Sequence, residues 1–532
     1  MTFRGSFEHK VLIASYETFR GYAHEVAGCG IDLVVCDEAH KLKNDESAVT
    51  RCIAGLEAKR RLLISGTPIQ NNLDEFFTLV SVANPGVFGD IHAFKKQYAW
   101  PILRGREPTA TAEERHKGQE QLDHLSAVTA QFILRRTNRL NARFLPPKKI
   151  FNVFVRATEF QRVLYHTFLQ SSVARNVLED QNGKLTRTVL ATIKKLQSLV
   201  NHPYLVRSAT QRLDAGFDDE RARAMFDEID QRDRGMRSND RPVRPELSGK
   251  MSLLHGLLLG IKASGSGDRI VIISNWTKTL DLVEKLCDQC KWPVHRLDGT
   301  MAINKRMKLV QDFNRPDNDK AFAFLLSSKA GGCGLNLIGA NRLVMFDPDW
   351  NPANDRQAMG RVWRDGQKKQ CYIYRFFTAG TIDEKVYQRQ ICKDGLSTMM
   401  VTETGEEEAT AMKESLDAEL VKDLFKFDEA ALCGTHDMLE CKRCHSSGAG
   451  YMTQEAEVME DDLLTWSHHV GVAGAEDDIL VNAGGRLVTF CMSCHIEYTA
   501  EQIAKMEEEE AAEQRRRQEA VAEARAAMAA AG

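Results

Sequence analysis

Two adjacent acids near the start of the chain have the types and the setting that phosphate chemistry requires. Asp37 and Glu38 follow an apolar stretch, residues 31–36, that is typical of a buried strand. A strand that delivers two carboxylates to the edge of a parallel sheet can hold Mg²⁺ and direct an attacking water. A helix N-cap or a surface ion pair is the alternative, but the apolar strand before the acids and His40 after them disfavour it.

Far along the chain, three residues have a spacing that predicts one helical face. Gln357, Arg361 and Arg364 stand at i, i+4 and i+7 in a helix predicted over residues 354–363. Arginine carries a planar fork that is always charged and can grip phosphate oxygens. We therefore predict that Arg361 and Arg364 are arginine fingers, with a salt-bridged helix face as the alternative. The acids and the arginines together predict a two-lobed ATP-driven motor.

Four cysteines near the C-terminus form two pairs with the spacing of zinc ligands. They are Cys441 with Cys444 and Cys491 with Cys494. Thiol pairs of this kind predict a Zn²⁺ site, although the spacer between the pairs is long, and free thiols are the alternative. Three more residues compete as ligands: Cys433, His468 and His469.

Alternating strands and helices are expected to position these groups. Short apolar strands are predicted at residues 11–15, 33–36 and 61–65 and again at 270–274, 294–297, 322–326, 343–346 and 371–376. Helices are predicted at residues 119–136, 159–178, 278–289, 305–313 and 354–363. Alternation of this kind predicts parallel sheets with right-handed crossovers. The charged stretch 216–245 is predicted to be a flexible insertion.

We therefore predict an α/β fold with two parallel-sheet lobes. The predicted parts are a partial first lobe at 1–83, a helical insertion and linker at 84–247, a second lobe at 248–400, a charged helical extension at 401–432, a zinc-type module at 433–496 and a charged helical tail at 497–532. The first lobe is predicted to be partial because no phosphate-cradling Gly-x-Gly-Lys-Thr precedes Asp37. The Gly-Lys pairs at 183–184 and 249–250 lack that spacing.

Composition excludes some classes of protein. The net charge of −3 over 532 residues argues against a uniformly basic surface, so a DNA path must be a local stripe. No apolar run approaches the ~20 residues that a membrane span needs, so no membrane partner is expected. The thirteen cysteines are scattered except near the C-terminus, which fits a reducing compartment better than a disulfide framework.

Four motifs in the expected order make the chain resemble the Swi/Snf-type ATPases of helicase superfamily two. Residues 37–40, 65–72, 328–337 and 357–367 look like motifs II, III, V and VI of that family. Residues 132–138, 145–148, 361–369 and 435–444 resemble its recombination-repair members. The resemblance implies two RecA-like lobes, ATP and Mg²⁺ as cofactors, and a nuclear protein that moves along double-stranded DNA in homologous recombination and double-strand break repair. It also implies a RecA-like strand-exchange recombinase as partner, and nucleosomes as a further partner.

The resemblance also assigns roles to single residues. The residues expected to contact ATP are Asp37, Glu38, Gly332, Gly334, Gln357, Arg361 and Arg364. Coupling of ATP chemistry to movement of the lobes is expected from His40, Ser65 and Thr67. Contacts to the DNA backbone are expected from Ser15, Tyr16, Asn275, Trp276 and Lys329, although Trp276 could equally be a core residue. In the resembled family the ligands that follow the first thiol pair come from near Trp466, which puts Cys491 and Cys494 in question.

Two other functions remain open at this stage. A chromatin remodeller of the same family is one, and residues 363–369 disfavour it. The other is a DNA- or partner-binding protein without ATPase activity, which the missing phosphate cradle favours. From the same absence we expect residues 1–532 alone to bind ATP weakly and to hydrolyse it no faster than background.

Overall fold

The computed structural model describes most of the chain and divides it into two compact units. The described residues are 10–42, 44, 47–66, 73–105, 110–134, 144–178, 187–208, 212–236, 241–318, 321–330, 334–399, 422–445, 450–451, 459–460, 462–508, 511–512 and 515. The first unit is Met1–Arg135 with Cys392–Met412 and Arg517–Gly532, and the second is Arg136–Ile391 with Lys413–Arg516.

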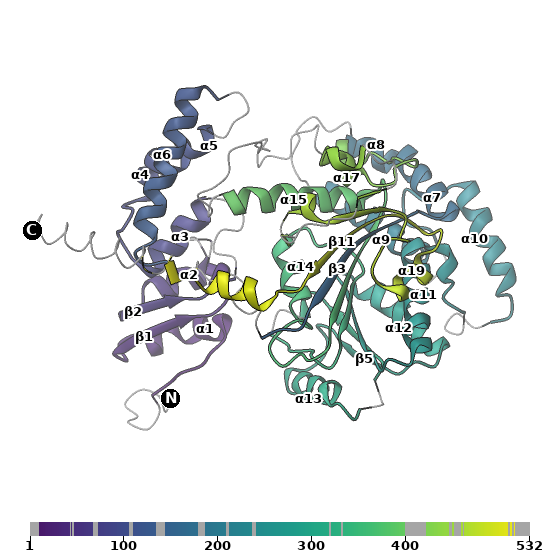
Figure 1. Ribbon diagram of the computed structural model, residues 1–532, viewed down its shortest axis with the longest axis horizontal. Coiled ribbons are helices and arrows are strands. Elements are labelled where there is room, and N and C mark those ends of the chain that lie inside the picture. The colour runs from purple at the N-terminus through teal and green to yellow at the C-terminus, as the bar shows by residue number, and fades with distance from the viewer. Residues whose placement is uncertain are drawn as a thin grey trace, which may run out of the picture. The chain divides into compact units, whose positions relative to one another are not determined.

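The first unit contains a small parallel sheet and a group of helices. Its elements are α1 (Tyr16–Val26), β1 (Ile31–Cys36), η1 (Ala39–Leu42), α2 (Ala48–Ala54), β2 (Ala58–Leu63), α3 (Leu73–Ala83), α4 (Ile91–Phe94), the π-helical turn η2 (Lys95–Ala99), α5 (Trp100–Gly105) and α6 (Ala112–Thr129) (Figure 1). Strands β1 and β2 pair in parallel, with Val35 opposite Leu62. This confirms the strand that leads to Asp37.

Three boundaries of the first unit differ from the prediction. Residues 11–15 form no strand, and Ser15 instead caps α1 by accepting a hydrogen bond from the Thr18 amide. Strand β2 begins three residues before the predicted start at Arg61 because Ala58 and Arg60 extend the pairing with Ile31 and Leu33. Helix α6 begins at Ala112, where Thr111 and Glu114 form a capping box.

The second unit is built around a large sheet. Its strands are β3 (Lys148–Val155), β4 (Ile270–Ser274), β5 (Val294–Leu297), β6 (Ala323–Ser327), β7 (Arg342–Met345), β8 (Cys371–Thr378), β9 (Gly450–Tyr451), β10 (Ser467–Val470) and β11 (Val488–Ile496). The strand order is β5-β6-β4-β7-β8-β3-β11-β10-β9. Pairing is parallel from β5 to β3 and antiparallel from β3 to β9.

Helices surround this sheet and form a separate helical core beside it (Figure 1). They are α7 (Glu159–Gln170), α8 (Ser172–Leu178), α9 (Arg187–Asn201), η4 (Pro203–Val206), α10 (Glu220–Arg232), η5 (Pro245–Leu247), α11 (Gly249–Ser264), α12 (Thr277–Gln289), α13 (Ile303–Asn314), α14 (Pro352–Met359), α15 (Ile382–Met399), α17 (Gly434–Met438), α18 (Lys442–His445), η7 (Leu463–Thr465) and α19 (Asp478–Gly484).

Apolar side chains cover both faces of the large sheet. Leu254 of α11 and Val283 of α12 belong to the core on one face, and Phe313 of α13 belongs to the core on the other. Strands β4 and β6 are buried along their whole length, as expected for central parallel strands. The five strands predicted between residues 270 and 376 are all present, within two residues at each end.

The large sheet extends beyond the predicted second lobe at both ends of the sequence. Strand β3 comes from the region predicted as helical insertion and linker, and β11 pairs with it over its whole length. The segment predicted as a zinc-type module, residues 433–496, therefore completes this sheet and is not separate from it. Sequence reasoning missed β3 because its apolar residues form a short run within a charged and otherwise helical region.

The described part of the stretch 216–245, which was predicted to be a flexible insertion, contains helix α10 and several ion pairs. Phe226 of α10 is 2% exposed within the helical core. Asp230 pairs with Arg207 and Arg241, and Asp233 pairs with Arg244. Ion pairs join the end of α10 to Arg241 and Arg244, so the high charge that suggested disorder partly stabilises the segment.

Two charged regions fall mostly outside the part of the chain that the structure describes. Residues 400–421 of the predicted helical extension lie outside it, as does most of the tail beyond residue 508. Residues 500–508 are helical, in agreement with the start of the predicted tail helix. Among the described helices, none combines the length and the apolar character that crossing a bilayer requires.

Candidate nucleotide and metal sites

The acidic edge of the first unit is held by backbone contacts at the end of β1. The Tyr16 hydroxyl donates to the Asp37 carbonyl oxygen at 2.7 Å, and the Glu38 amide donates to Asp37 Oδ1 at 2.9 Å. Ala39 N donates to Ile64 O at 2.9 Å, which ties the turn after the acids to the end of β2. Glu38 has a φ of 50°, a left-handed backbone that non-glycine residues seldom adopt. The turn is therefore constrained to present both acids.

His40 lies where a link between the acids and the next strand is expected. Its Nδ1 lies 3.3 Å from Glu38 Oε2 and 3.5 Å from Ser65 Oγ. This geometry agrees with a coupling role for His40 and Ser65, which stays a prediction. Thr67, predicted as the third coupling residue, lies outside the described residues.

The arginines do not share one helical face with Gln357, so that part of the prediction is wrong. Helix α14 ends at Met359, and Gly360 caps it. Arg361 and Arg364 lie in the turns that follow, so the i+4 and i+7 spacing does not apply to them. Gly360 is a residue type that commonly ends helices, a signal that the prediction from spacing did not use.

The turns after α14 are fastened to the glycine-rich segment that ends at Leu337. Leu337 N donates to Arg361 O at 3.0 Å, and Arg364 Nη1 donates to Leu335 O at 3.3 Å. Arg361 is 5% exposed and Arg364 is half-buried. The bond to Leu335 uses one of the five N–H donors that an arginine side chain carries. We call residues 361–367 the arginine loop.

Only one of the two predicted phosphate-contacting glycines can be placed. Gly334 has a φ of 62°, and a side chain there would meet open space. The left-handed backbone therefore explains the glycine, and a close approach of ligand is not needed to account for it. Gly332 lies outside the described residues.

The predicted DNA contacts are distributed over both units. Lys329 is exposed, as a phosphate contact must be. The backbone N–H of Asn275 donates to Oδ1 of the buried Asp347 at 2.8 Å. The Lys194 ammonium lies 4.9 Å from the centre of the Trp276 ring. Ser15 caps a helix, and burial raises the pKa of Tyr16 above its ordinary value. The roles of these residues in DNA binding stay predictions.

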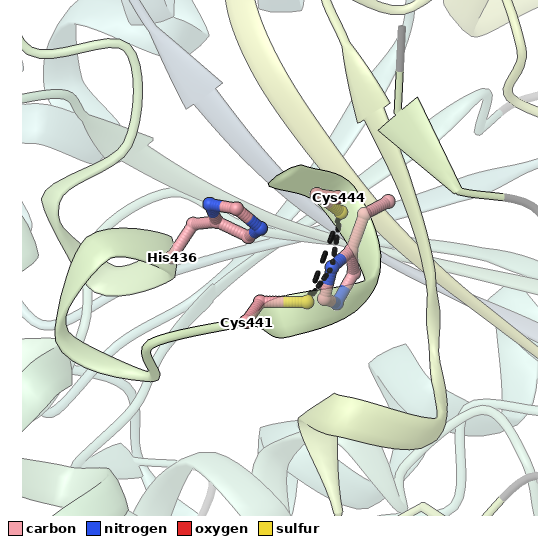
Figure 2. A group of neighbouring side chains, drawn as sticks. His436, Cys441 and Cys444 are labelled. Carbon is pink, nitrogen blue, oxygen red and sulfur yellow. Dashed lines mark hydrogen bonds between the residues drawn. The ribbon is translucent and has the colours of Figure 1, made fainter. Parts of the chain in front are cut away.

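A group of four side chains in the second unit has the geometry of a metal centre. His436, Cys441, Cys444 and His468 place one ligand atom each within 4.8 Å of all the others. Figure 2 shows His436, Cys441 and Cys444 turned toward one another from α17, α18 and the segment between them. The two sulfur atoms are 3.8 Å apart, and His468 Nδ1 lies 3.6 Å from Cys441 Sγ and 3.5 Å from Cys444 Sγ.

These spacings fit tetrahedral zinc. Zn–S bonds of about 2.3 Å and Zn–N bonds of about 2.0 Å give tetrahedron edges of roughly 3.8 Å between sulfurs and roughly 3.5 Å between sulfur and nitrogen. His468 Nε2 donates to Leu463 O at 2.9 Å, which leaves Nδ1 to face the thiols with its lone pair. Burial lowers the pKa of His468 to about 4, so the ring stays neutral, as a metal ligand must be.

The two thiols of the group differ in their readiness to ionise. Burial acts to raise the pKa of Cys441, but hydrogen bonds from Cys444 and Arg443 outweigh it and leave that pKa below the ordinary value. Burial and the hydrogen bond with Cys441 raise the pKa of Cys444 to about 11. Cys441 is therefore the first thiolate of the group, and a cation would favour ionisation of the second.

Cys491 and Cys494, predicted as the second ligand pair, do not join this group. Both lie in strand β11, where they are 0% and 2% exposed. Side chains three residues apart on a strand point to opposite faces, and the two cysteines belong to the cores on opposite sides of the sheet. They cannot hold one ion together. Their two-residue spacing is a coincidence of strand sequence.

The three competing ligands are separated by the structure. His468 joins the metal group. Its neighbour His469 points to the other face of β10, with Nε2 3.1 Å from Ser493 Oγ. Cys433 Sγ accepts a hydrogen bond from His436 N at 3.3 Å as the cap of α17. Sequence reasoning missed His436 as a ligand, although it stands five residues before Cys441, within the segment that carries the family resemblance.

Lys250 supports the rejection of the second Gly-Lys pair as a phosphate loop. Its side chain is fully buried, and Nζ donates to Asn201 Oδ1 at 2.6 Å and to Asp383 Oδ2 at 2.5 Å. The lysine therefore joins α11 to α9 and α15 within the core. A buried, paired ammonium of this kind cannot reach a nucleotide.

Two family models match the chain in the order expected of a two-lobed ATPase. The SNF2-related domain matches residues 4–205, and the helicase conserved C-terminal domain matches residues 249–366. Together they cover more than half of the chain. The acids fall in the first match, and Arg361 and Arg364 fall in the second. The chain belongs to the SNF2 family of ATPases.

Within that family the chain is RAD54-like. It is 44% identical over 485 residues to the DNA repair and recombination protein RAD54-like of Gallus gallus, with 91% of this chain and 64% of the relative covered. It is 42% identical to DNA repair and recombination protein RAD54 of Oryza sativa subsp. japonica, covering 92% of this chain and 54% of the relative. Identity is also 42% with Protein CHROMATIN REMODELING 25 of Arabidopsis thaliana, covering 92% and 58%.

The chain spans less than two thirds of the length of each of these relatives. Among solved structures, the Sulfolobus solfataricus SWI2/SNF2 ATPase core in complex with dsDNA is 22% identical and covers 79% of this chain and 78% of that one, with a TM-score of 0.35. Because this TM-score is low, the fold is described from the strand order of this chain and not from that structure.

Proposed function

We propose that this protein hydrolyses ATP to move along double-stranded DNA in homologous recombination and double-strand break repair, once a phosphate cradle, which does not precede Asp37 in residues 1–532, is supplied. The observation that carries the proposal is the acidic turn after β1, where Glu38 and Asp37 are presented by a constrained backbone and His40 links Glu38 to Ser65. The match to RAD54-like relatives over nine tenths of the chain supports the choice of pathway. A nuclear location and a RecA-like recombinase as partner belong to the same proposal.

Each charged group then has a separate task. Asp37 holds Mg²⁺, and Glu38 orients or deprotonates the attacking water. Arg361 and Arg364 neutralise charge on the transferring phosphate. Ser15, Tyr16, Asn275, Trp276 and Lys329 serve as candidate contacts to the DNA backbone.

A structural zinc ion held by His436, Cys441, Cys444 and His468 is part of the proposal. The donor set of two thiols and two imidazoles and the ligand spacings support it. With four protein ligands the ion would have no open position for chemistry, so its contribution is to folding. Its ligands join α17 and α18 to strand β10, and thereby to the large sheet.

The test measures ATP turnover with and without double-stranded DNA. The protein is translated from the natural transcript, because residues 1–532 alone are expected to be inactive. We expect duplex DNA to stimulate turnover and single-stranded DNA of equal length to stimulate it less. Glu38→Gln should abolish the stimulated rate without loss of DNA binding, because it removes the base and keeps the shape. Turnover that duplex DNA does not stimulate, or that Glu38→Gln leaves unchanged, would refute the proposal.

Nucleosome remodelling is a second candidate function. The similarity to Protein CHROMATIN REMODELING 25 at the same identity as the rice relative is the observation that favours it. Turnover on nucleosomes compared with free DNA of the same length separates the two candidates. A remodeller should be stimulated more by nucleosomes than by the free duplex.

A further inference from the structure

Trp363, which lies between the two arginines in the chain, is held by residues from outside the arginine loop. Its Nε1 donates to Pro146 O at 2.8 Å, and the Lys148 ammonium lies 3.7 Å from the centre of its ring. A lysine this close to a tryptophan ring is attracted by its negative face. Trp363 is 9% exposed, so little water competes for these contacts. Pro146 and the first residue of β3 therefore determine where Trp363 sits.

Lys148 depends in turn on a carboxylate from the C-terminal part of the chain. Its side chain is 4% exposed, and Nζ donates to Glu460 Oε2 at 2.7 Å. Removal of one partner from a buried ion pair leaves a charge without compensation in a dry site. Glu460 thus holds the Lys148 ammonium in place above the indole.

The segment that carries Glu460 is ordered by the region around the metal-ligand group. Trp466 Nε1 donates to Met459 O at 3.1 Å, and Met459 N donates to Thr465 Oγ1 at 3.0 Å. The ligand His468 donates through Nε2 to Leu463 in the same segment. Continuous contacts therefore run from the metal-ligand group through Glu460 and Lys148 to Trp363.

We propose that Glu460, Lys148 and Trp363 form a clamp through which the C-terminal module positions the arginine loop for ATP hydrolysis. All three are positioning residues and none touches the nucleotide. The proposal rests on the proposed function, because it needs Arg361 and Arg364 to act on the phosphate. A displacement of about 1 Å at a reacting group can cost about a hundredfold in rate, so the hold on Trp363 bears on turnover.

The test replaces the charges of the clamp and keeps its shape. Glu460→Gln removes the carboxylate charge at a half-exposed position, and Lys148→Met removes the ammonium. The matched control is Lys149→Met, because Lys149 is the next residue of β3 and pairs with Glu476 of the same C-terminal module at 2.9 Å. Two quantities are measured: the kcat and KM for ATP with duplex DNA, and hydrogen exchange of residues 361–367.

Both clamp variants should lower kcat by about tenfold or more and leave KM for ATP within about twofold, since alignment is lost and nucleotide contacts remain. Exchange in residues 361–367 should speed up, and Lys148→Arg should restore both readouts because arginine also stacks on indole. Lys149→Met should change neither.

The two readouts separate failure of the clamp from failure of the proposed function. Unchanged exchange in residues 361–367 in both Glu460→Gln and Lys148→Met would overturn the clamp. Faster exchange with unchanged kcat would overturn the role of the arginine loop in hydrolysis and the positioning role that depends on it. If Lys148→Met fails to fold, Glu460→Gln alone decides between these outcomes.

Discussion

The two sheets that the structure describes differ in how far their faces are covered. In the sheet of the first unit, Leu33 and Val35 of β1 are 51% and 52% exposed. In the sheet of the second unit, every residue of β4 and β6 is buried, and apolar cores cover both faces. Yet the small sheet carries the acids that would hold Mg²⁺ and activate water, and most of the large sheet carries no candidate chemistry.

The acids Asp37 and Glu38 and the arginines Arg361 and Arg364 are therefore positioned in different ways. The acids depend on a few local contacts, chiefly Tyr16 to Asp37 and Ala39 to Ile64. The arginine loop is hydrogen-bonded to Leu335, Leu337 and Pro146. Leu335 and Leu337 are part of the apolar core on one face of the large sheet. Local opening should therefore expose the acidic turn more readily than the arginine loop.

The largest expected effect concerns the metal group at the far end of the large sheet. Elemental analysis should find about one Zn²⁺ per chain, and Cys441→Ser should release it, since structural zinc contributes roughly 10–16 kcal/mol of binding free energy to folding. Exchange in β10 and β11 should then speed up, while exchange in β1 should stay the same.

The control for this experiment is Cys494→Ala, which removes a thiol of the same spacing from the core. It should destabilise β11 through lost packing and leave the zinc content unchanged. A chain that holds no zinc, or that loses it in Cys494→Ala, would show that the ligand set is wrong.

The two thiol pairs also show how far sequence reasoning reaches. Spacing predicted both, but only in the first pair can both sulfurs face one ion, since Cys444 lies in the short helix α18 and Cys441 directly precedes it. Cys491 and Cys494 lie on opposite faces of one strand. The spacing of residues in the sequence does not show the local backbone conformation. His436 and His468 could be assigned as ligands only from the structure, which brings α17 and β10 together.

The fold was predictable to a similar extent. Strands such as β4 and β7 were recognisable in the sequence as apolar runs, because they are buried on both faces. Strand β3 and the ordered segment around α10 did not, because their stability comes from partners far away in the sequence. Val488 opposite Val155 and Arg207 with Asp230 are such contacts. The end of α14 before Arg361 was missed although Gly360 marks it, because the prediction relied on the spacing of the polar residues.

The second prediction tests whether the large sheet contributes chemistry through its arginine loop. In the protein expressed from its own transcript, Arg361→Ala or Arg364→Ala should lower DNA-stimulated ATP turnover by ~10³-fold or more, the scale of an arginine finger. DNA binding should remain nearly intact. Lys369→Ala is the control, since Lys369 is a half-exposed cation near the loop that pairs with Asp268. Turnover within tenfold of the unaltered protein would exclude both arginines from the role.

The third prediction compares the stability of one strand from each sheet, β1 and β4. Amide hydrogens of β1 should exchange at least about tenfold faster than those of β4, because opening free energies fall where few buried apolar contacts support a strand. Hydrogen exchange with mass spectrometry on the intact protein resolves peptides from 31–36 and 270–274. Equal protection of the two strands would mean that exposed Leu33 and Val35 do not weaken the small sheet.

The smallest expected effect belongs to one hydrogen bond at the acidic turn. Tyr16→Phe removes the hydroxyl that donates to the Asp37 carbonyl and keeps the ring, which packs against the apolar core that includes Cys36 and Leu42. The loss should be about 1 kcal/mol of local stability, the usual net value of such a bond. Because the bond supports the backbone between the two acids, exchange at residues 36–40 should speed up by about fivefold while exchange in β4 stays the same. Ser15→Ala, which removes the cap of α1 next to Tyr16, is the matched control. If Ser15→Ala speeds exchange at the acidic turn as much as Tyr16→Phe does, then α1 as a whole supports the acids and the single hydroxyl has no special part.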